Sequence, residues 1–293
     1  MTVKHSARSI LLMKILVVLI HNNSKERLDY ARPMISDFKE KVRCNAEDTE
    51  IELMEVSFQP ELKPCSLFLT LLRNIRQTKL EFAWNKYKEV DNNGFLKALE
   101  IFFKVVTARY VLHPSVRRAW QEKSAIEIAV TSKHARAWGV FVESGLDYLM
   151  VLEDDIVFKT DSVERFCTTV IPALKSSGRK AVYFDLAGGF PQEVLGIGAL
   201  ESGCYNDMIF YSKPVGNTSC CYLIDKSMAK YFISKLVEKP SLYLTAADWL
   251  VLEHFMEMRD HARDCICIHF SPTIFYHGSF MGNYASFIRK ETQ

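Results

Sequence analysis

The feature that most constrains the fold is the short apolar run at residues 14–20 (KILVVLI), which is rich in β-branched residues and ends in a polar stretch. Such a run is typical of a strand buried on both faces of a parallel sheet. Residues 29–42 then carry apolar side chains at helical spacing, and residues 51–56 again have the character of a strand. This order predicts the β-loop-α-β unit of a doubly wound, nucleotide-binding sheet.

The length of 293 residues suits one large α/β domain or two small ones, and we expect a single domain over residues 1–293. The chain is 48% hydrophobic and 25% charged, as ordinary globular proteins are, and its net charge of +2 gives no overall electrostatic reason to expect nucleic acid as a partner. The apolar run at residues 10–20 is about half as long as a membrane span, and no signal-peptide cleavage site follows it. We therefore expect a cytoplasmic protein.

The eight cysteines lack the paired spacing of zinc sites. The adjacent Cys220 and Cys221 and the strand-spaced Cys265 and Cys267 fit small buried hydrophobic residues better than a disulfide framework. We expect reduced thiols and assign them no chemistry.

Residues 65–120 differ from the rest, because lysines and arginines are interleaved with aromatic and aliphatic residues. This pattern predicts a helical insert within the domain, with a turn at residues 91–94 (DNNG) between two of its helices. A helical layer with solvated charges explains it. Peripheral contact with an anionic membrane surface is a second interpretation.

Three carboxylates, Glu153, Asp154 and Asp155, directly follow the apolar run at residues 148–152 (YLMVL). Open α/β sheets bind their ligands at the carboxyl ends of strands, and adjacent carboxylates repel one another unless a cation compensates. Oxygen ligands select Mg²⁺ or Mn²⁺, which in turn bridge diphosphate oxygens. An exposed acidic turn is the alternative, but the apolar residues 156–158 follow the triplet at once.

The expected directions of the three side chains give the carboxylates of the triplet different roles. Because side chains alternate along a strand, Glu153 and Asp155 would form a metal clamp on one side. Asp154 would face the other side, where it would contact the nucleotide or order the loop.

Residues around the triplet resemble glycosyltransferase family 25, which includes bacterial lipooligosaccharide galactosyltransferases and collagen galactosyltransferases. The chain matches the family pattern at Glu127, at His134 seven residues later, at Trp138 four residues beyond, and at the EDD triplet. It departs from the pattern at residues 129–130 (AV), where the family has Gly-Cys, and at Lys133, where the family has Ser. The insert lies outside the resemblance.

The resemblance implies a GT-A-like, Rossmann-type mixed sheet flanked by helices. It also implies an inverting hexosyltransferase, with UDP-galactose as the family-level donor and an oligosaccharide or glycoconjugate as acceptor, as in lipopolysaccharide biosynthesis. Mn²⁺ or Mg²⁺ would act as a Lewis acid on the departing diphosphate. Acceptor specificity would most easily differ in the insert.

Asp248 and His277 are the candidate partners of the triplet. Asp248 opens an apolar, helix-like run and is the candidate base for the acceptor hydroxyl, although a simple N-cap explains it equally well. His277 follows an apolar strand and would complete the metal site or bind phosphate, unless it is structural. Residues 278–284 would form a flexible loop closing over the donor, or an uneventful C-terminal segment.

Three further residues are candidates for donor binding. His134 shares a helical face with Trp138, which is either the donor side of the cleft or a packed core face. Arg27 and Lys133 are the nearest basic residues for the diphosphate charge.

Two other classes remain open. A metal-dependent nucleotidyltransferase or phosphotransferase uses the same kind of carboxylates, although the sequence has no phosphate-binding loop motif. A lectin-like or calcium-binding module would need a separate ligand set. Further strands are predicted at residues 181–186 and 220–224, and helices at 127–142, 226–237 and 246–258.

Overall fold

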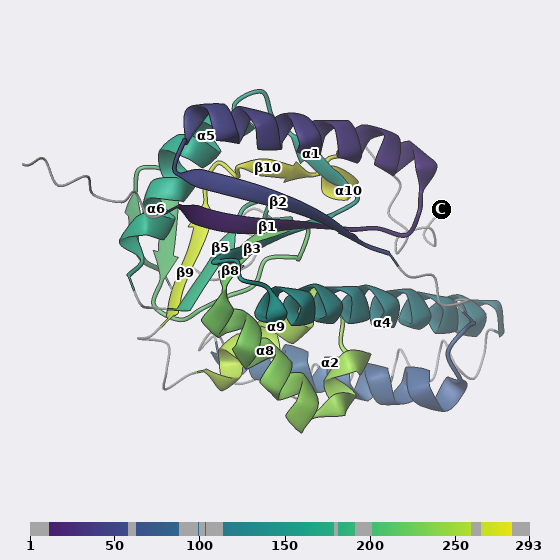
Figure 1. Ribbon diagram of the computed structural model, residues 1–293. Coiled ribbons are helices and arrows are strands. Elements are labelled where there is room, and N and C mark those ends of the chain that lie inside the picture. The colour runs from purple at the N-terminus through teal and green to yellow at the C-terminus, as the bar shows by residue number, and fades with distance from the viewer. Residues whose placement is uncertain are drawn as a thin grey trace, which may run out of the picture.

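The computed structural model describes residues 12–57, 63–87, 99, 103, 114–178, 181–190, 201–258 and 265–282. Its centre is an eight-stranded mixed sheet of order β2-β1-β3-β8-β5-β9-β7-β6, with helices on both faces (Figure 1). The strands are β1 (Met13–Ile20), β2 (Thr49–Val56), β3 (Tyr148–Glu153), β5 (Ala181–Asp185), β6 (Glu201–Tyr205), β7 (Met208–Tyr211), β8 (Cys221–Asp225) and β9 (Cys265–Phe270). A separate sheet pairs β4 (Ile156–Phe158) with β10 (Phe275–His277). The predicted α/β class with a mixed sheet is confirmed.

The predicted opening unit is present. β1 pairs in parallel with β2 on one side and with β3 on the other. Its side chains alternate between the two faces, with Ile15 and Val17 in one core and Leu16 and Val18 in the other, which explains its uniform hydrophobicity. Helix α1 (Lys25–Asn45) begins four residues earlier than predicted, so Arg27 lies in its first turn.

The two cores lie on opposite faces of the sheet. One face is covered by α1, α5 (Ser162–Arg165), the π-helical turn η2 (Phe166–Val170) and α6 (Ile171–Ser176). The other is covered by α4 (Pro114–Glu143), α8 (Lys226–Glu238), the 3₁₀ turn η4 (Pro240–Leu244) and α9 (Ala247–Glu257). Aromatic pairs centre each layer, with Phe38 against Phe166 on the first face and Trp138 against Phe232 on the second.

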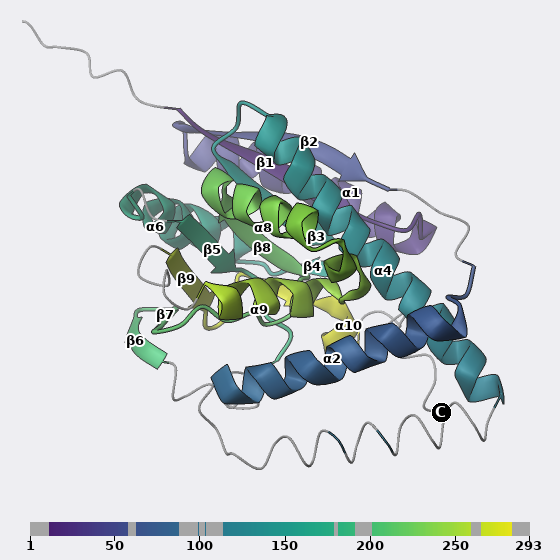
Figure 2. The ribbon, with the colours of Figure 1, turned by 90° about the horizontal axis from the view of Figure 1, so that it is seen from below.

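Helix α2 (Leu67–Tyr87) packs outside α4 and α9, as Figure 2 shows. It is one of two parts of the predicted helical insert that the structure describes, the other being residues 114–120; the turn expected at residues 91–94 lies outside the described residues. The helix that was expected to begin at residue 127 begins instead at Pro114, so α4 runs across residue 120, the predicted end of the insert. Among the described helices, none is both long and apolar enough to cross a bilayer.

The direction of β8 determines where the site forms. β8 runs antiparallel to both β3 and β5, so the start of β8 lies beside the end of β3. The amide of Glu153, the last residue of β3, donates to the carbonyl of Cys220 at 2.8 Å. The ends of β1 and β3 and the start of β8 therefore share one edge of the sheet.

Candidate functional site

A cavity of about 640 Å³ opens at this edge, a size typical of small-molecule sites. Its walls come from the loop after β1, the helices α1, α2, α4 and α9, the turn after β3, and the β10 segment. The residues predicted from the sequence that line it are Arg27, Lys133, Glu153, Asp154, Asp155, Asp248 and His277. His134 is fully buried behind Glu153 and does not line the cavity.

The acidic triplet is not a continuous strand. β3 ends at Glu153, and Asp154 and Asp155 form the turn that leads into β4. Strand alternation is therefore the wrong reason to group Glu153 with Asp155. The turn instead brings each carboxylate to a different set of partners.

Glu153 is held by a chain of hydrogen bonds from helix α4, from strand β8 and from Ser219 just before β8. The Trp138 indole donates to the Tyr222 hydroxyl at 2.9 Å, and that hydroxyl lies 2.8 Å from Nδ1 of His134. If the hydroxyl donates to Nδ1, Nε2 carries the hydrogen that faces the Glu153 carboxylate at 3.1 Å. Ser219 donates to the same carboxylate at 2.6 Å. Burial by itself would raise the pKa of Glu153, but the His134 and Ser219 contacts lower it to about 2.

Asp154 forms a buried ion pair with Arg27, with 2.6 Å between Oδ1 and the guanidinium. It also accepts the backbone N–H of Asn22 at 3.3 Å. Burial raises the pKa of Asp154, and the Arg27 contact opposes that rise. Lys133 donates to the carbonyl of His21 at 2.7 Å, and burial lowers its pKa. Lys133 thus holds the loop after β1 directly, Arg27 is linked to that loop through Asp154, and both basic residues line the cavity.

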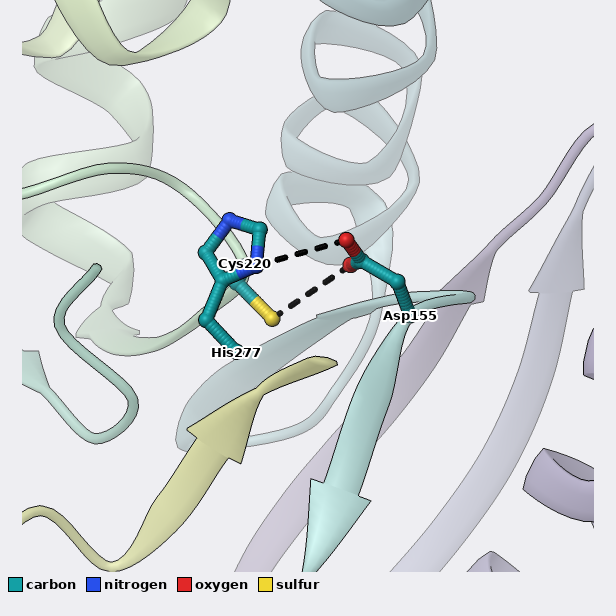
Figure 3. A group of neighbouring side chains, drawn as sticks. All are labelled: Asp155, Cys220 and His277. Atoms are coloured by element: carbon teal, nitrogen blue, oxygen red, sulfur yellow. Dashed lines mark hydrogen bonds and ion pairs between the residues drawn. The ribbon is translucent and has the colours of Figure 1, made fainter. Parts of the chain in front are cut away.

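Asp155 lies opposite two donors of different chemistry (Figure 3). Its Oδ2 is 3.3 Å from Nδ1 of His277, and its Oδ1 is 3.6 Å from the Cys220 sulfur. Ser279 also donates to Oδ2, and the Gly278 amide donates to the Asp155 carbonyl at 2.8 Å. One ligand atom from each of Asp155, Cys220 and His277 lies within 4.8 Å of the other two, so the group has the dimensions of a metal site.

Asp248 faces the same cavity from the first turn of α9. The N-cap of α9 is Ala246, so the alternative of a simple N-cap at Asp248 is wrong. The Asp248 carboxylate accepts the N–H of Trp249 at 2.9 Å. Burial raises its pKa to about 6, and the charges of Glu127 and Glu153 add to this effect. A carboxyl of this kind can exchange a proton near neutral pH.

The C-terminal segment is built into the wall. Residues 278–281 form the short helix α10 (Gly278–Met281) instead of the predicted flexible loop; residues 283 and 284 lie outside the described residues. Phe280 packs on Phe190 and on His277, with ring centroids 4.6 and 4.5 Å apart. This contact restricts the orientation of the His277 ring.

Three residues that complete the site, Ser219, Cys220 and Tyr222, have no role in the sequence-based predictions, and Ser279 was expected only as part of a closing loop. Each reaches a predicted residue only through long-range folding. The polar pair Ser219–Cys220 at the start of a buried strand was the one available local signal.

No model of a known protein family matches the chain, and no curated protein matches it. The resemblance to glycosyltransferase family 25 thus stays a prediction from the residues that carry it.

Proposed function

We propose that the protein is a nucleotide-sugar-dependent glycosyltransferase with a GT-A-like fold, which transfers a hexose to a hydroxyl acceptor. One observation carries the proposal: a single cavity at the strand ends is lined by the EDD triplet, by the anchored side chains of Arg27 and Lys133, and by the Asp248 carboxyl with a pKa of about 6. Such a cavity suits a leaving diphosphate and an attacking hydroxyl. UDP-galactose is the donor expected from the family resemblance.

A divalent cation fits the residues opposite Asp155. Nδ1 of His277 is buried and has no hydrogen-bond partner, although the Asp155 carboxylate is 3.3 Å away. Imidazole nitrogen with carboxylate oxygen suits Mn²⁺ better than Mg²⁺. Asp155 and His277 would hold the ion, and the ionised Glu153 would add negative charge beside it. When bound, the ion stabilises the charge that develops on the departing diphosphate.

The loop after β1 forms the donor side of the cavity in this proposal. Asp154 fastens that loop through Arg27 and the Asn22 amide, so of its two predicted roles we favour ordering the loop. Arg27 and Lys133 keep positive charge in the same wall. Their contribution is to the electrostatic potential that the diphosphate meets.

Asp248 is the proposed base. The acceptor oxygen attacks the anomeric carbon while its proton passes to the Asp248 carboxylate, and the bond from that carbon to the diphosphate oxygen breaks. This single displacement inverts the anomeric centre. The acceptor would enter beside Asp248 along the seam of α2 and α4, where Asn74, Gln77 and Trp120 line the cavity.

Thermal-shift measurements with Mn²⁺ and a panel of nucleotide sugars test the proposal. We expect UDP-sugars to raise the melting temperature and Asp155→Ala to remove the metal-dependent part of that rise. Asp161→Ala, at an exposed position outside the cavity, is the matched control and should behave as the wild type. Failure of every nucleotide sugar to bind, with and without metal, would refute the transferase. Phosphoryl or nucleotidyl transfer from a nucleoside triphosphate would favour the alternative class.

A further inference from the structure

Three donor atoms of different elements converge from three segments at the back of the cavity. Asp155 comes from the turn after β3, Cys220 from the residue before β8, and His277 from the end of β10 (Figure 3). The Oδ2–Nδ1 distance is 3.3 Å and the Sγ–Oδ1 distance is 3.6 Å. A tetrahedral ion with bonds of about 2.0–2.3 Å holds its ligand atoms about 3.3–3.8 Å apart. Each of the two distances lies in that range, the His277 distance to Oδ2 of Asp155 and the Cys220 distance to Oδ1, and one ligand atom from each residue lies within 4.8 Å of the other two.

Hydrogen bonding by itself does not account for the arrangement. The thiol of Cys220 and the hydroxyl of Ser279 satisfy the two oxygens of Asp155. The same bonds leave Nδ1 of His277 buried without a hydrogen-bond partner, although it is aimed at the same carboxylate. A cation among the three groups would give this nitrogen a partner.

Cys220 lies on the side of the group that faces away from the cavity. The residue is 1% exposed and does not line the cavity, whereas Asp155 and His277 do. Three protein ligands with a fourth position open to the cavity is the arrangement of catalytic zinc sites. The open position would take water or a diphosphate oxygen. Sulfur is a poor ligand for Mg²⁺ and a good one for Zn²⁺ and Co²⁺.

We infer that Cys220 is a third ligand of this site and that the site binds sulfur-tolerant divalent cations, with Zn²⁺ above Mn²⁺ and Mg²⁺ weakest. The inference rests on the cation site of the proposed function and adds its third ligand and its selectivity. Binding replaces the thiol hydrogen: the sulfur forms a bond to the cation and the proton leaves to solvent.

Metal binding to the full chain, without nucleotide sugar, tests the inference. Isothermal titration should show Zn²⁺ binding at least about a hundredfold tighter than Mg²⁺. The Co²⁺ form should show a sulfur-to-cobalt charge-transfer band in the near ultraviolet. Cys220→Ser should abolish the band and weaken Zn²⁺ binding by about 10–100-fold or more, with little change for Mg²⁺.

Cys221→Ser is the matched control, because Cys221 is the adjacent buried thiol but is not part of the group. It should keep both the band and the Zn²⁺ affinity, which separates the site from adventitious binding to other cysteines. Melting temperatures without metal show whether each variant folds, and the wild-type band tests sulfur ligation even if Cys220→Ser does not fold. A wild-type Co²⁺ form without the band, or unchanged Zn²⁺ affinity in folded Cys220→Ser, would overturn the inference.

The two proposals fail separately. Nucleotide-sugar binding with Mn²⁺ but without the Co²⁺ band leaves the transferase standing and removes Cys220 from the site. A thiolate-ligated metal without any nucleotide-sugar binding keeps the site and removes the transferase.

Discussion

The Asp248 carboxyl provides a test of the site that needs no substrate. Burial, with the charges of Glu127 and Glu153, raises its pKa from 3.8 to about 6. A carboxyl whose pKa rises on folding binds its proton more tightly in the folded state. The protonated Asp248 carboxyl therefore contributes to the free energy of unfolding at low pH, and this contribution is lost as the pH rises from about 4 to about 6.

The magnitude follows from the shift. The difference between 3.8 and about 6 is roughly two pKa units, so at pH 7 the ionised Asp248 costs the folded state about 3 kcal/mol. Asp248→Asn keeps the shape, carries no charge, and can still accept the Trp249 amide. Relative to the wild type, this variant should gain about 2–3 kcal/mol in its free energy of unfolding between pH 4 and pH 7.

Urea unfolding of both proteins at pH 4, 5, 6 and 7 measures this difference. The matched control is Asp161→Asn, at an exposed position, whose stability difference from the wild type should change by less than about 0.5 kcal/mol over the same range. A difference between Asp248→Asn and the wild type that is the same at pH 4 and pH 7 would show that Asp248 ionises normally. Its pKa would then give it no advantage as a general base near neutral pH.

Three other predictions concern the cavity wall and the reaction. Arg27→Met should lower the free energy of unfolding, measured in urea, by about 3–5 kcal/mol, because it leaves the buried Asp154 carboxylate without its cationic partner. Adding Asp154→Leu should restore most of that stability. A double variant no more stable than Arg27→Met would contradict this. Tyr222→Phe removes the hydroxyl partner of His134 and should lower the free energy of unfolding by about 1–3 kcal/mol. It should also reduce the rise in melting temperature that nucleotide sugars produce. With Asp248 as base, kcat/KM should fall about tenfold from pH 7 to pH 5; a flat profile would exclude that role.

The fold could be predicted where burial makes the sequence uniform. β1 and β3 are buried on both faces, so their apolar runs give their positions to within about one residue. The early part of α4 was missed because that end leaves the sheet and packs against α2, which dilutes the apolar periodicity. The short edge strand β6 and its neighbour β7 carry little periodic signal.

The sequence predicts the strand-end position of the triplet but not the partners of its residues. Carboxylates after an apolar run mark the end of a strand whatever the rest of the chain does. The expectation that Glu153 and Asp155 face the same side assumed that the strand continues through the triplet. The strand ends at Glu153, and turn geometry, which three acidic residues do not specify, sets the directions of the other two.

The antiparallel β8 explains why Ser219 and Cys220 were not expected at the site. Sequence reasoning about α/β sheets looks for functional residues after strands, because parallel strands bring only their carboxyl ends to the binding edge. An antiparallel strand reverses this rule and brings its start to the same edge, as the 2.8 Å bond from the Glu153 amide to the Cys220 carbonyl shows. In a mixed sheet the residues just before an antiparallel strand are therefore as strong candidates as those just after a parallel one. Strand direction, however, is a long-range property that no local pattern in this chain reveals.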